Sequence, residues 1–511
     1  MAEHQDPEPY SALNQATGSI STRHSRNRTG CLTCRRRRKR CDGVRDVCGH
    51  CDRLNLVCHW QSRRNLNADL APGYRANADA SPLATASSTP AIYIAPPPVA
   101  FLKSDACEDE SAQKSLDQRL ALRYYVQAFT SILTTNLENN GFLSVLLPMA
   151  FEDKTLLDML VAWSSAHLSL CDDSYRVKAL EHRSTALRSF STSISRSRDS
   201  PEASLAGCLV LCSMSAILGD TAGWHNHLVG AAQIISHSTA SASPQDGLVR
   251  VANTYEGRWL LRNFAYHDIL MSVTCDREPL IRGRYWRFET RAAADTYFGL
   301  ASDPMAWISE ISVLNSCLKR EAELPLTTGR TGFELALSPV NQDGALLSPA
   351  VNGFTTRLHE IKLALRGWTC ADSTDPCLVN LAEAYRSAAM LHLYRTMRRW
   401  IPDTDPDLDS KIQLHVGAII THVGQMPLGC LPECTSLFPL FMAGGEAKSK
   451  PEMQFIRDRL QHIVTYRCFQ NAVSALSVLE ELWLQHTSII GDHALDWLDI
   501  LKRRDWNLAL S

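Results

Sequence analysis

Residues 31–58 read CLTCRRRRKRCDGVRDVCGHCDRLNLVC, and this stretch decides how the N-terminal part of the chain folds. Its cysteines form an internal repeat, because C-x2-C-x6-C occurs twice with six residues between the copies. A structural zinc site takes four thiolate or imidazole ligands in a tetrahedron. Six cysteines fill the eight ligand positions of two zinc ions only if two of them bind both ions. The spacing therefore predicts a two-zinc cluster on six ligands, which are Cys31, Cys34, Cys41, Cys48, Cys51 and Cys58.

Two other arrangements of these cysteines are weighed against the cluster. Six cysteines in 28 residues also suit the disulfide framework of a small secreted domain. Residues 1–20 contain no apolar run typical of a signal peptide, however, and six consecutive cations have no role in a disulfide loop. The other arrangement is a single zinc on Cys31, Cys34, Cys48 and Cys51, which would leave Cys41 and Cys58 idle at equivalent places in both repeats. The two-zinc cluster uses every thiol and is favoured.

The same stretch resembles the DNA-binding module of the fungal binuclear zinc cluster transcription factors, over about residues 29–60. One departure is Asp46, which stands where members of that family often carry proline, and it bears on the loop between the repeats and not on the ligands. His50 and His59 adjoin cysteines but are not needed as ligands. The resemblance implies that Cys31 and Cys48 bridge the ions, with terminal ligands Cys34 and Cys41 on one ion and Cys51 and Cys58 on the other.

The two repeats differ in everything except their cysteine spacing. Six cations follow Cys34, whereas Cys51 is followed by DRLNLV, so that one repeat faces a polyanion and the other packs. The resemblance implies that Arg37 and Arg38 contact bases in CGG triplets, since arginine can pair with guanine O6 and N7 in the major groove. The other cations of the run are expected to bind phosphates, and these are Arg35, Arg36, Lys39 and Arg40. A nuclear-localisation patch or a solvated face would not explain why the run lies inside the cysteine frame.

Charge is unevenly distributed along the 511 residues. Residues 22–64 contain 13 basic and 3 acidic side chains, a net charge of +10, whereas the whole chain has a net charge of −2. A basic N-terminal part on an acidic remainder is typical of a protein that binds nucleic acid at one end. Residues 1–28 are polar and are expected to form a disordered basic arm. Residues 61–115 contain SPLATASSTPAIYIAPPPV and are expected to form a flexible linker without the heptads of a coiled coil, which leaves a homodimer open.

From residue 116 to residue 511 the sequence predicts a large α-helical domain, and the fold class is therefore mainly all-α. Apolar residues recur with helical spacing, as in Leu156, Leu157, Leu160 and Val161, and strand-like alternation is scarce. Residues 239–248 and 321–352 are rich in Ser, Pro and Gly and are expected to be surface loops. Helices are predicted near 116–129 and 156–168, and at 176–196, 202–219, 225–238, 255–275, 354–368, 377–399, 411–424, 451–464 and 468–486.

This region resembles, more loosely, the regulatory domain found in one large branch of the same fungal family. The resemblance implies a nuclear regulatory domain with an all-helical fold and transfers no functional residues. The stretches that carry it are RYYVQAF (123–129), LLPMAFEDKTLLDMLVAWSSAHL (146–168), GWHNHLVGAAQII (223–235), AYHDIL (265–270) and SLFPLFMAGGEA (436–447).

Other candidate sites in the helical region are weak. GxSxG, GxxxxGK[ST], GxGxxG after a strand and HExxH are all absent, so the sequence predicts no enzyme. His225 and His227 lie two residues apart and would point to different faces of a helix. Cys208 with Cys212 and Cys430 with Cys434 are interpreted as packing residues rather than redox or ligand-sensing pairs, because buried free cysteines are common. No apolar stretch of about 20 residues predicts a membrane span.

Together these features predict a nuclear, sequence-specific regulator of RNA polymerase II transcription, serving a metabolic or biosynthetic pathway. Its expected partners are double-stranded DNA, the transcription machinery or its coregulators, and a small-molecule effector of the helical domain. The competing interpretations are a metabolic enzyme or ligand-binding protein that carries an accessory zinc module, and a zinc-stabilised protein- or RNA-binding module. The target genes and the direction of regulation, activation or repression, do not follow from the sequence.

Overall fold

The computed structural model describes residues 34, 41–42, 48–53, 110–196, 201–236, 244–287, 294–323, 349–401, 406–488 and 496–511. The chain divides into two compact units, residues 1–87 and residues 88–511. In the described part of the first unit, Cys34 is helical, and one helical turn, α2 (Gly49–Asp52), begins directly after Cys48.

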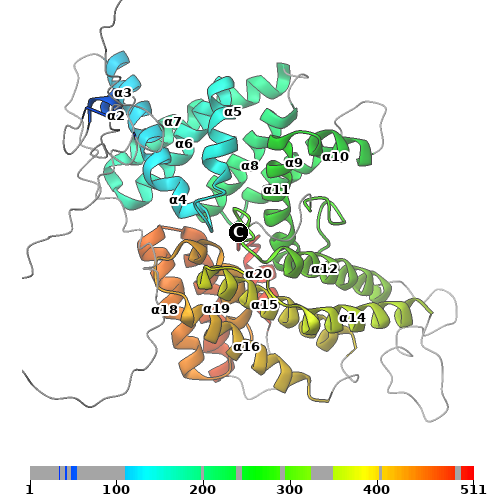
Figure 1. The fold of residues 1–511 in the computed structure, drawn as a ribbon. Helices are drawn as coiled ribbons and strands as arrows, with labels where there is room; N and C mark the ends of the chain where they lie inside the picture. Colours follow the sequence, from blue (N-terminus) through cyan, green and yellow to red (C-terminus); the bar gives the residue numbers. More distant parts are fainter. Residues whose placement is uncertain are drawn as a thin grey trace, which may run out of the picture. The chain divides into compact units, whose positions relative to one another are not determined.

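The described residues of the first half of the second unit are mostly helical (Figure 1). Its elements are α3 (Glu110–Tyr124), η2 (Tyr125–Phe129), α4 (Thr130–Leu133), η3 (Phe142–Leu146), α5 (Leu147–Glu152), α6 (Lys154–Cys171), η4 (Asp173–Tyr175), α7 (Arg176–Arg196), α8 (Pro201–Ile217), α9 (Trp224–Ser236), α10 (Pro244–Ala252) and α11 (Tyr255–Thr274).

The second half continues in the same way and confirms the predicted all-α class. Within the described residues, strand-like pairing is limited to an isolated bridge between Asp295 and Gly299. The elements are α12 (Ser302–Glu323), α14 (Pro349–Gly367), α15 (Pro376–Trp400), α16 (Leu408–Gln425), η6 (Leu431–Thr435), α17 (Leu437–Gly444), α18 (Lys450–Arg467), α19 (Gln470–Ser488) and α20 (Trp497–Arg504).

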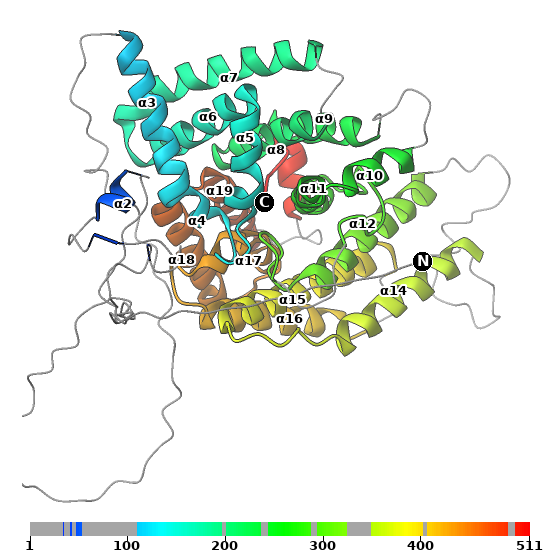
Figure 2. The same ribbon diagram turned by 45° about the horizontal axis from the view of Figure 1, so that its top comes forward.

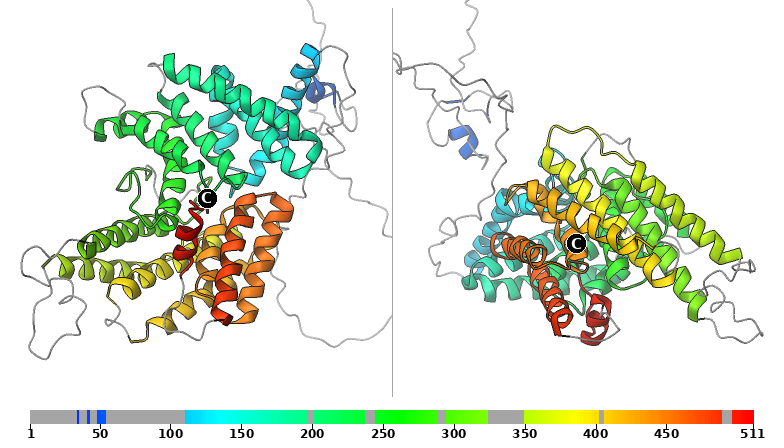
Figure 3. Two further views of the ribbon diagram at one scale, coloured as in Figure 1. Left: turned by 180° about the vertical axis from the view of Figure 1, so that it is seen from behind. Right: turned by 90° about the horizontal axis from the view of Figure 1, so that it is seen from below.

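Helix α8 is buried on all sides within this unit. Every residue of α8 from Leu205 to Ile217 is buried, as expected of a helix enclosed by others rather than one with a single apolar stripe. Neighbouring helices then pair along their lengths, α6 with α7 and α15 with α16 (Figure 2). From behind, α18, α19 and α20 lie next to one another on the orange-to-red side (Figure 3). The unit has one continuous core that includes residues from all of these helices.

Two predicted loops are partly helical, and proline explains the error. The expected loop at 239–248 overlaps α10, which begins at Pro244, and the expected loop at 321–352 overlaps the start of α14 at Pro349. Proline is favoured in the first turn of a helix, because its missing N–H has no helical partner there. Helices α8 and α15 also begin with a proline. Within the described residues, no helix is both long enough and apolar enough to cross a bilayer.

We expect the helical unit to lose stability in acid. Burial lowers the pKa of His167 to about 4 and the pKa values of His267 and His392 to about 3, so these imidazoles stay neutral in the fold. The unfolded chain takes up their protons below about pH 6.5, which costs roughly 1.4 kcal/mol per histidine and pH unit. Burial raises the pKa of Asp268 to about 7, and that group opposes the loss by a similar amount per pH unit.

For these four groups together, the expected loss is roughly 3 kcal/mol in the free energy of unfolding per pH unit between pH 6 and pH 4. Urea unfolding at pH 7, 6 and 5, followed by far-ultraviolet circular dichroism, measures it. Equal unfolding free energies at pH 7 and pH 5 would show that these histidines are not held neutral.

Candidate metal centre and nucleic-acid module

Three cysteines of the first unit surround one point. The Sγ atom of Cys34 lies 3.6 Å from that of Cys48 and 3.9 Å from that of Cys51, and all three residues are fully buried. Two thiolates on one tetrahedral zinc lie about 3.8 Å apart when each Zn–S bond is about 2.3 Å. The donor set and its spacing therefore fit zinc.

The local fold of the second repeat explains this convergence. Cys48 is the N-cap of α2, and its Sγ accepts a hydrogen bond from the backbone N–H of Cys51 at 3.4 Å. The C-x2-C spacing therefore corresponds to one helical turn, with Cys48 as its N-cap and Cys51 within it. Burial raises the pKa of the Cys48 thiol, but hydrogen bonds from the Cys51 backbone and the Cys51 and Cys34 side chains outweigh it and lower that pKa to about 6. The thiolate, which is the metal-binding form of cysteine, is therefore favoured.

A second group joins the two repeats through Cys48. Candidate ligand atoms of Cys41, Asp42 and Cys48 all lie within 4.8 Å of one another, so Cys48 belongs to both groups. The sequence analysis did not single out Asp42, whose Oδ2 accepts a hydrogen bond from the backbone N–H of Gly49 at 2.7 Å. A Cβ atom at position 49 would lie 2.8 Å from that oxygen, so glycine allows this close approach. The carboxylate lies at the N-terminus of α2, where negative charge is favourable.

These positions bear on the choice between one zinc and two. Cys34, Cys48 and Cys51 are common to both arrangements, whereas Cys41 has a role only in the two-zinc cluster, and it lies beside Cys48. The separation of Cys34 and Cys51 is that of two ligands of one ion, although the predicted assignment gives them to different ions. The predicted ligands Cys31 and Cys58 and the predicted DNA contacts Arg35, Arg36, Arg37, Arg38, Lys39 and Arg40 lie outside the described residues and stay predictions.

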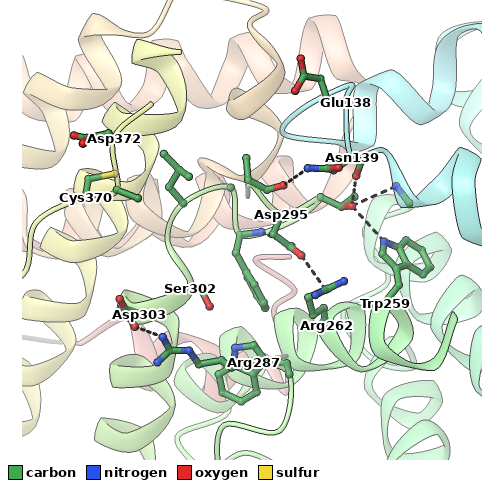
Figure 4. Close-up of a pocket in the computed structure, with 18 of the residues that line it drawn as sticks. Glu138, Asn139, Trp259, Arg262, Arg287, Asp295, Ser302, Asp303, Cys370 and Asp372 are labelled. Carbon is green, nitrogen blue, oxygen red and sulfur yellow. Dashed lines mark hydrogen bonds and ion pairs between the residues drawn. The ribbon is translucent and has the colours of Figure 1, made fainter. Parts of the chain in front are cut away.

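The helical unit contains a separate cavity of about 490 Å³, which the sequence analysis did not foresee (Figure 4). Arg262 pairs with Asp295 at 3.1 Å in its wall, and Thr296 accepts a hydrogen bond from Trp259 Nε1 at 3.2 Å. Elsewhere in the wall, Asp303 binds Arg287 at 2.8 Å and Trp368 Nε1 at 3.1 Å. The exposed carboxylates of Glu138 and Asp372 also line the cavity.

Six charged side chains line this cavity, and they carry a net charge of −2. They are Glu138, Arg262, Arg287, Asp295, Asp303 and Asp372. Three tryptophans, Trp259, Trp286 and Trp368, line it as well.

The structure also shows where the weaker candidates from the sequence lie. Cys208 and Cys212 are buried in α8, as predicted, and burial raises the pKa of Cys208 to about 12. His225 and His227 lie in α9 and are partly exposed. Among the described residues, neither histidine belongs to a group of three or more metal-ligating side chains.

Comparison with known proteins matches each of the two units to a domain family. Residues 29–67 match the fungal Zn(2)-Cys(6) binuclear cluster domain, and residues 119–511 match the fungal specific transcription factor domain. The chain is 27% identical over 299 residues to the transcriptional activator protein UGA3 of Saccharomyces cerevisiae. That match covers 50% of this chain and 56% of the relative, so the chain spans about half the length of the curated relative.

These matches decide between the interpretations that the sequence left open. A binuclear cluster binds two zinc ions, which excludes the single-zinc ribbon and the disulfide framework. Both families are families of transcription factors and not of enzymes. The chain belongs to the fungal-specific transcription factors and carries a binuclear zinc cluster domain.

Proposed function

We propose that this protein regulates RNA polymerase II transcription of the genes of one metabolic or biosynthetic pathway by binding CGG-type sites in the nucleus. The observation that carries the proposal is the cluster of the Cys34, Cys48 and Cys51 thiols, because Cys34 directly precedes the run of six cations at 35–40. A metal site at this place would fix the start of the cationic segment, so that its side chains are presented to DNA in one orientation. The relative is named as a transcriptional activator, which favours activation.

We propose the following division of labour along the chain. Residues 1–28 extend the basic surface, residues 29–60 bind DNA, residues 61–115 tether the module, and residues 116–511 receive signals and recruit coregulators. The six cysteines hold two zinc ions, with Cys31 and Cys48 as the bridging ligands. The net charge of +10 over residues 22–64 supports DNA as the partner of the first unit.

Base contact and phosphate contact are separable by mutation. We expect Arg38→Ala to weaken binding to a CGG site by about 1–3 kcal/mol and to relax the preference for guanine. Arg35→Ala should weaken binding evenly across sequences and reduce the salt dependence by about one counterion. Fluorescence anisotropy at fixed ionic strength, with CGG and scrambled duplexes, measures both.

The same assay distinguishes DNA from RNA as the partner. Structured RNA should compete poorly with the CGG duplex for the unmodified chain. Equal losses from the two variants on all duplexes would contradict the proposed roles of Arg38 and Arg35, and efficient competition by RNA would contradict a DNA-specific module.

We also propose that the helical domain binds its small-molecule effector in the cavity of Figure 4. Its net charge of −2 and its three tryptophans favour a small organic cation, because the face of an indole ring attracts cations. We expect a primary amine or quaternary ammonium compound from a screened panel to change the tryptophan fluorescence of the full chain. The affinity for this compound, obtained from the fluorescence titration, should be at least about tenfold lower in a Glu138→Gln, Asp372→Asn variant. Fluorescence that responds to organic anions but not to cations would contradict this chemistry.

A further inference from the structure

Two thiols that are 297 positions apart in the sequence meet in the helical unit. Cys171 is the last residue of α6, and Cys468 directly follows α18. Their Sγ atoms lie 3.1 Å apart, with the Cys171 thiol donating to the sulfur of Cys468. Both side chains are partly exposed. The pair is therefore in contact and accessible to a small solute.

Hydrogen bonds fix the backbone on both sides of this contact. His167, one helical turn before Cys171, bonds through Nε2 to the carbonyl oxygen of Arg467 and through Nδ1 to the hydroxyl of Tyr124, each at 2.8 Å. The Arg467 guanidinium in turn donates to the carbonyl oxygen of Ile132 at 2.9 Å. The end of α6 and the end of α18 are thus held against each other next to the two sulfur atoms.

Cys468 has an unusual backbone conformation for its residue type. Its φ of 55° and ψ of 30° lie in the left-handed region, where glycine or asparagine is the usual residue after a helix. Packing of the surrounding helices therefore holds this cysteine in a conformation that its own Cβ disfavours.

We propose that Cys171 and Cys468 form an oxidative modification site, at which hydrogen peroxide converts the two thiols into an intramolecular disulfide. The proposal goes beyond DNA binding and does not depend on it. It makes the helical domain responsive to peroxide, and dithiol reductants reverse the reaction.

The direction of the hydrogen bond identifies the attacking sulfur. The bond from Cys171 lowers the pKa of Cys468, in opposition to burial, and the same bond raises the pKa of Cys171. In the first step the Cys468 thiolate attacks one peroxide oxygen, so that an S–O bond forms and the O–O bond breaks. The released hydroxide takes up a proton and leaves as water, and Cys468 becomes a sulfenic acid.

In the second step Cys171 resolves the sulfenic acid. Its sulfur attacks the sulfur of Cys468, the S–S bond forms and the S–O bond breaks, and the hydroxide leaves as water with the Cys171 proton. Two thiols and one peroxide thus give one disulfide and two water molecules. The two sulfurs lose two electrons in total, and the peroxide gains them.

Other cysteines of the helical unit are less suited to this chemistry. Cys208 and Cys212 are buried within α8, and Cys377 and Cys430 are also buried. Cys317 is partly exposed, but the contact that its sulfur makes at 3.3 Å is with the Arg320 guanidinium and not with a second thiol. It provides a matched control, because serine at that position keeps an acceptor for Arg320.

Peptide mapping tests the proposal on the full chain. The protein is treated with hydrogen peroxide, its remaining thiols are blocked with N-ethylmaleimide, and the digest is searched for a peptide that joins Cys171 to Cys468. We expect this cross-link in the unmodified chain and in Cys317→Ser, and its disappearance on reduction. In Cys171→Ser we expect a sulfenic acid at Cys468 that dimedone traps. The cross-linked chain should also melt roughly 5–10 °C higher, because the bond closes a long loop.

The outcome that overturns the proposal is equally direct. If Cys171 and Cys468 are both recovered as N-ethylmaleimide adducts after peroxide has oxidised other cysteines of the same chain, the pair is not an oxidation site. Recovery of these cysteines only in disulfides between two chains would also overturn it. Because every modification is located by peptide, oxidation of the zinc-binding cysteines does not affect the result.

Discussion

Replacing Cys48 with serine is expected to abolish zinc binding by the N-terminal module and to lower its affinity for a specific DNA site by at least about 1,000-fold, to the level of non-specific binding. Cys48 is the cysteine that reaches both ligand groups, and its Sγ also caps α2. Loss of a shared ligand opens both tetrahedra, and metal binding supplies the folding energy of small zinc modules. Fluorescence anisotropy with a CGG duplex measures the loss.

The matched control for this variant is Cys317→Ser in the helical unit. Cys317 is partly exposed on α12 and lies in neither group of metal-ligating side chains. We expect its DNA affinity to equal that of the unmodified chain within about twofold. A Cys48→Ser chain that retains specific DNA binding would show that the cluster does not depend on a shared thiolate at this position.

Replacing Arg467 with alanine is expected to lower the free energy of unfolding of the helical unit by about 3–5 kcal/mol. This side chain is 5% exposed and lies 3.4 Å from the fully buried carboxylate of Glu433. It also donates to the backbone carbonyl oxygens of Ile132 and Cys430. Alanine would leave the two buried carbonyl oxygens without this donor, and it would remove one of the two arginines that contact Glu433, the other being Arg459 at 3.5 Å. Urea unfolding, followed by circular dichroism, measures the change.

Arg457, on the same helix, is the control for this prediction. Its guanidinium is 30% exposed and pairs with Glu480 at 3.0 Å on the surface. Surface ion pairs contribute little, so Arg457→Ala should change the free energy of unfolding by no more than about 1 kcal/mol. If both variants lose the same free energy of unfolding, the contribution of Arg467 does not depend on its burial.

Much of the helical unit was predictable from apolar spacing. Each of the predicted helical stretches overlaps a helix of the structure, and the prediction at 176–196 coincides with α7. Helix α12 was missed although its signal was present, since Met305, Ile308, Ile311 and Leu314 follow one another at three-residue intervals and are buried. The loop predictions, which were based on Ser, Pro and Gly content, failed where a proline occupies the first turn of a helix.

The two-zinc cluster was predictable because the chemistry is local. The spacing of the six cysteines can be read directly from 28 residues, and each structural zinc ion takes four ligands. The ion pair of Arg262 with Asp295 and the contact of Cys171 with Cys468 join segments that are distant in the sequence. No periodicity or motif predicts such contacts, because they depend on how whole helices pack.

Zinc content of the purified full-length chain tests the central claim most directly. The chain is dialysed against metal-free buffer, and zinc is measured by elemental analysis against protein concentration. A cluster in which six thiolates share two ions predicts two zinc ions per polypeptide. One zinc ion per polypeptide, or none, would contradict it.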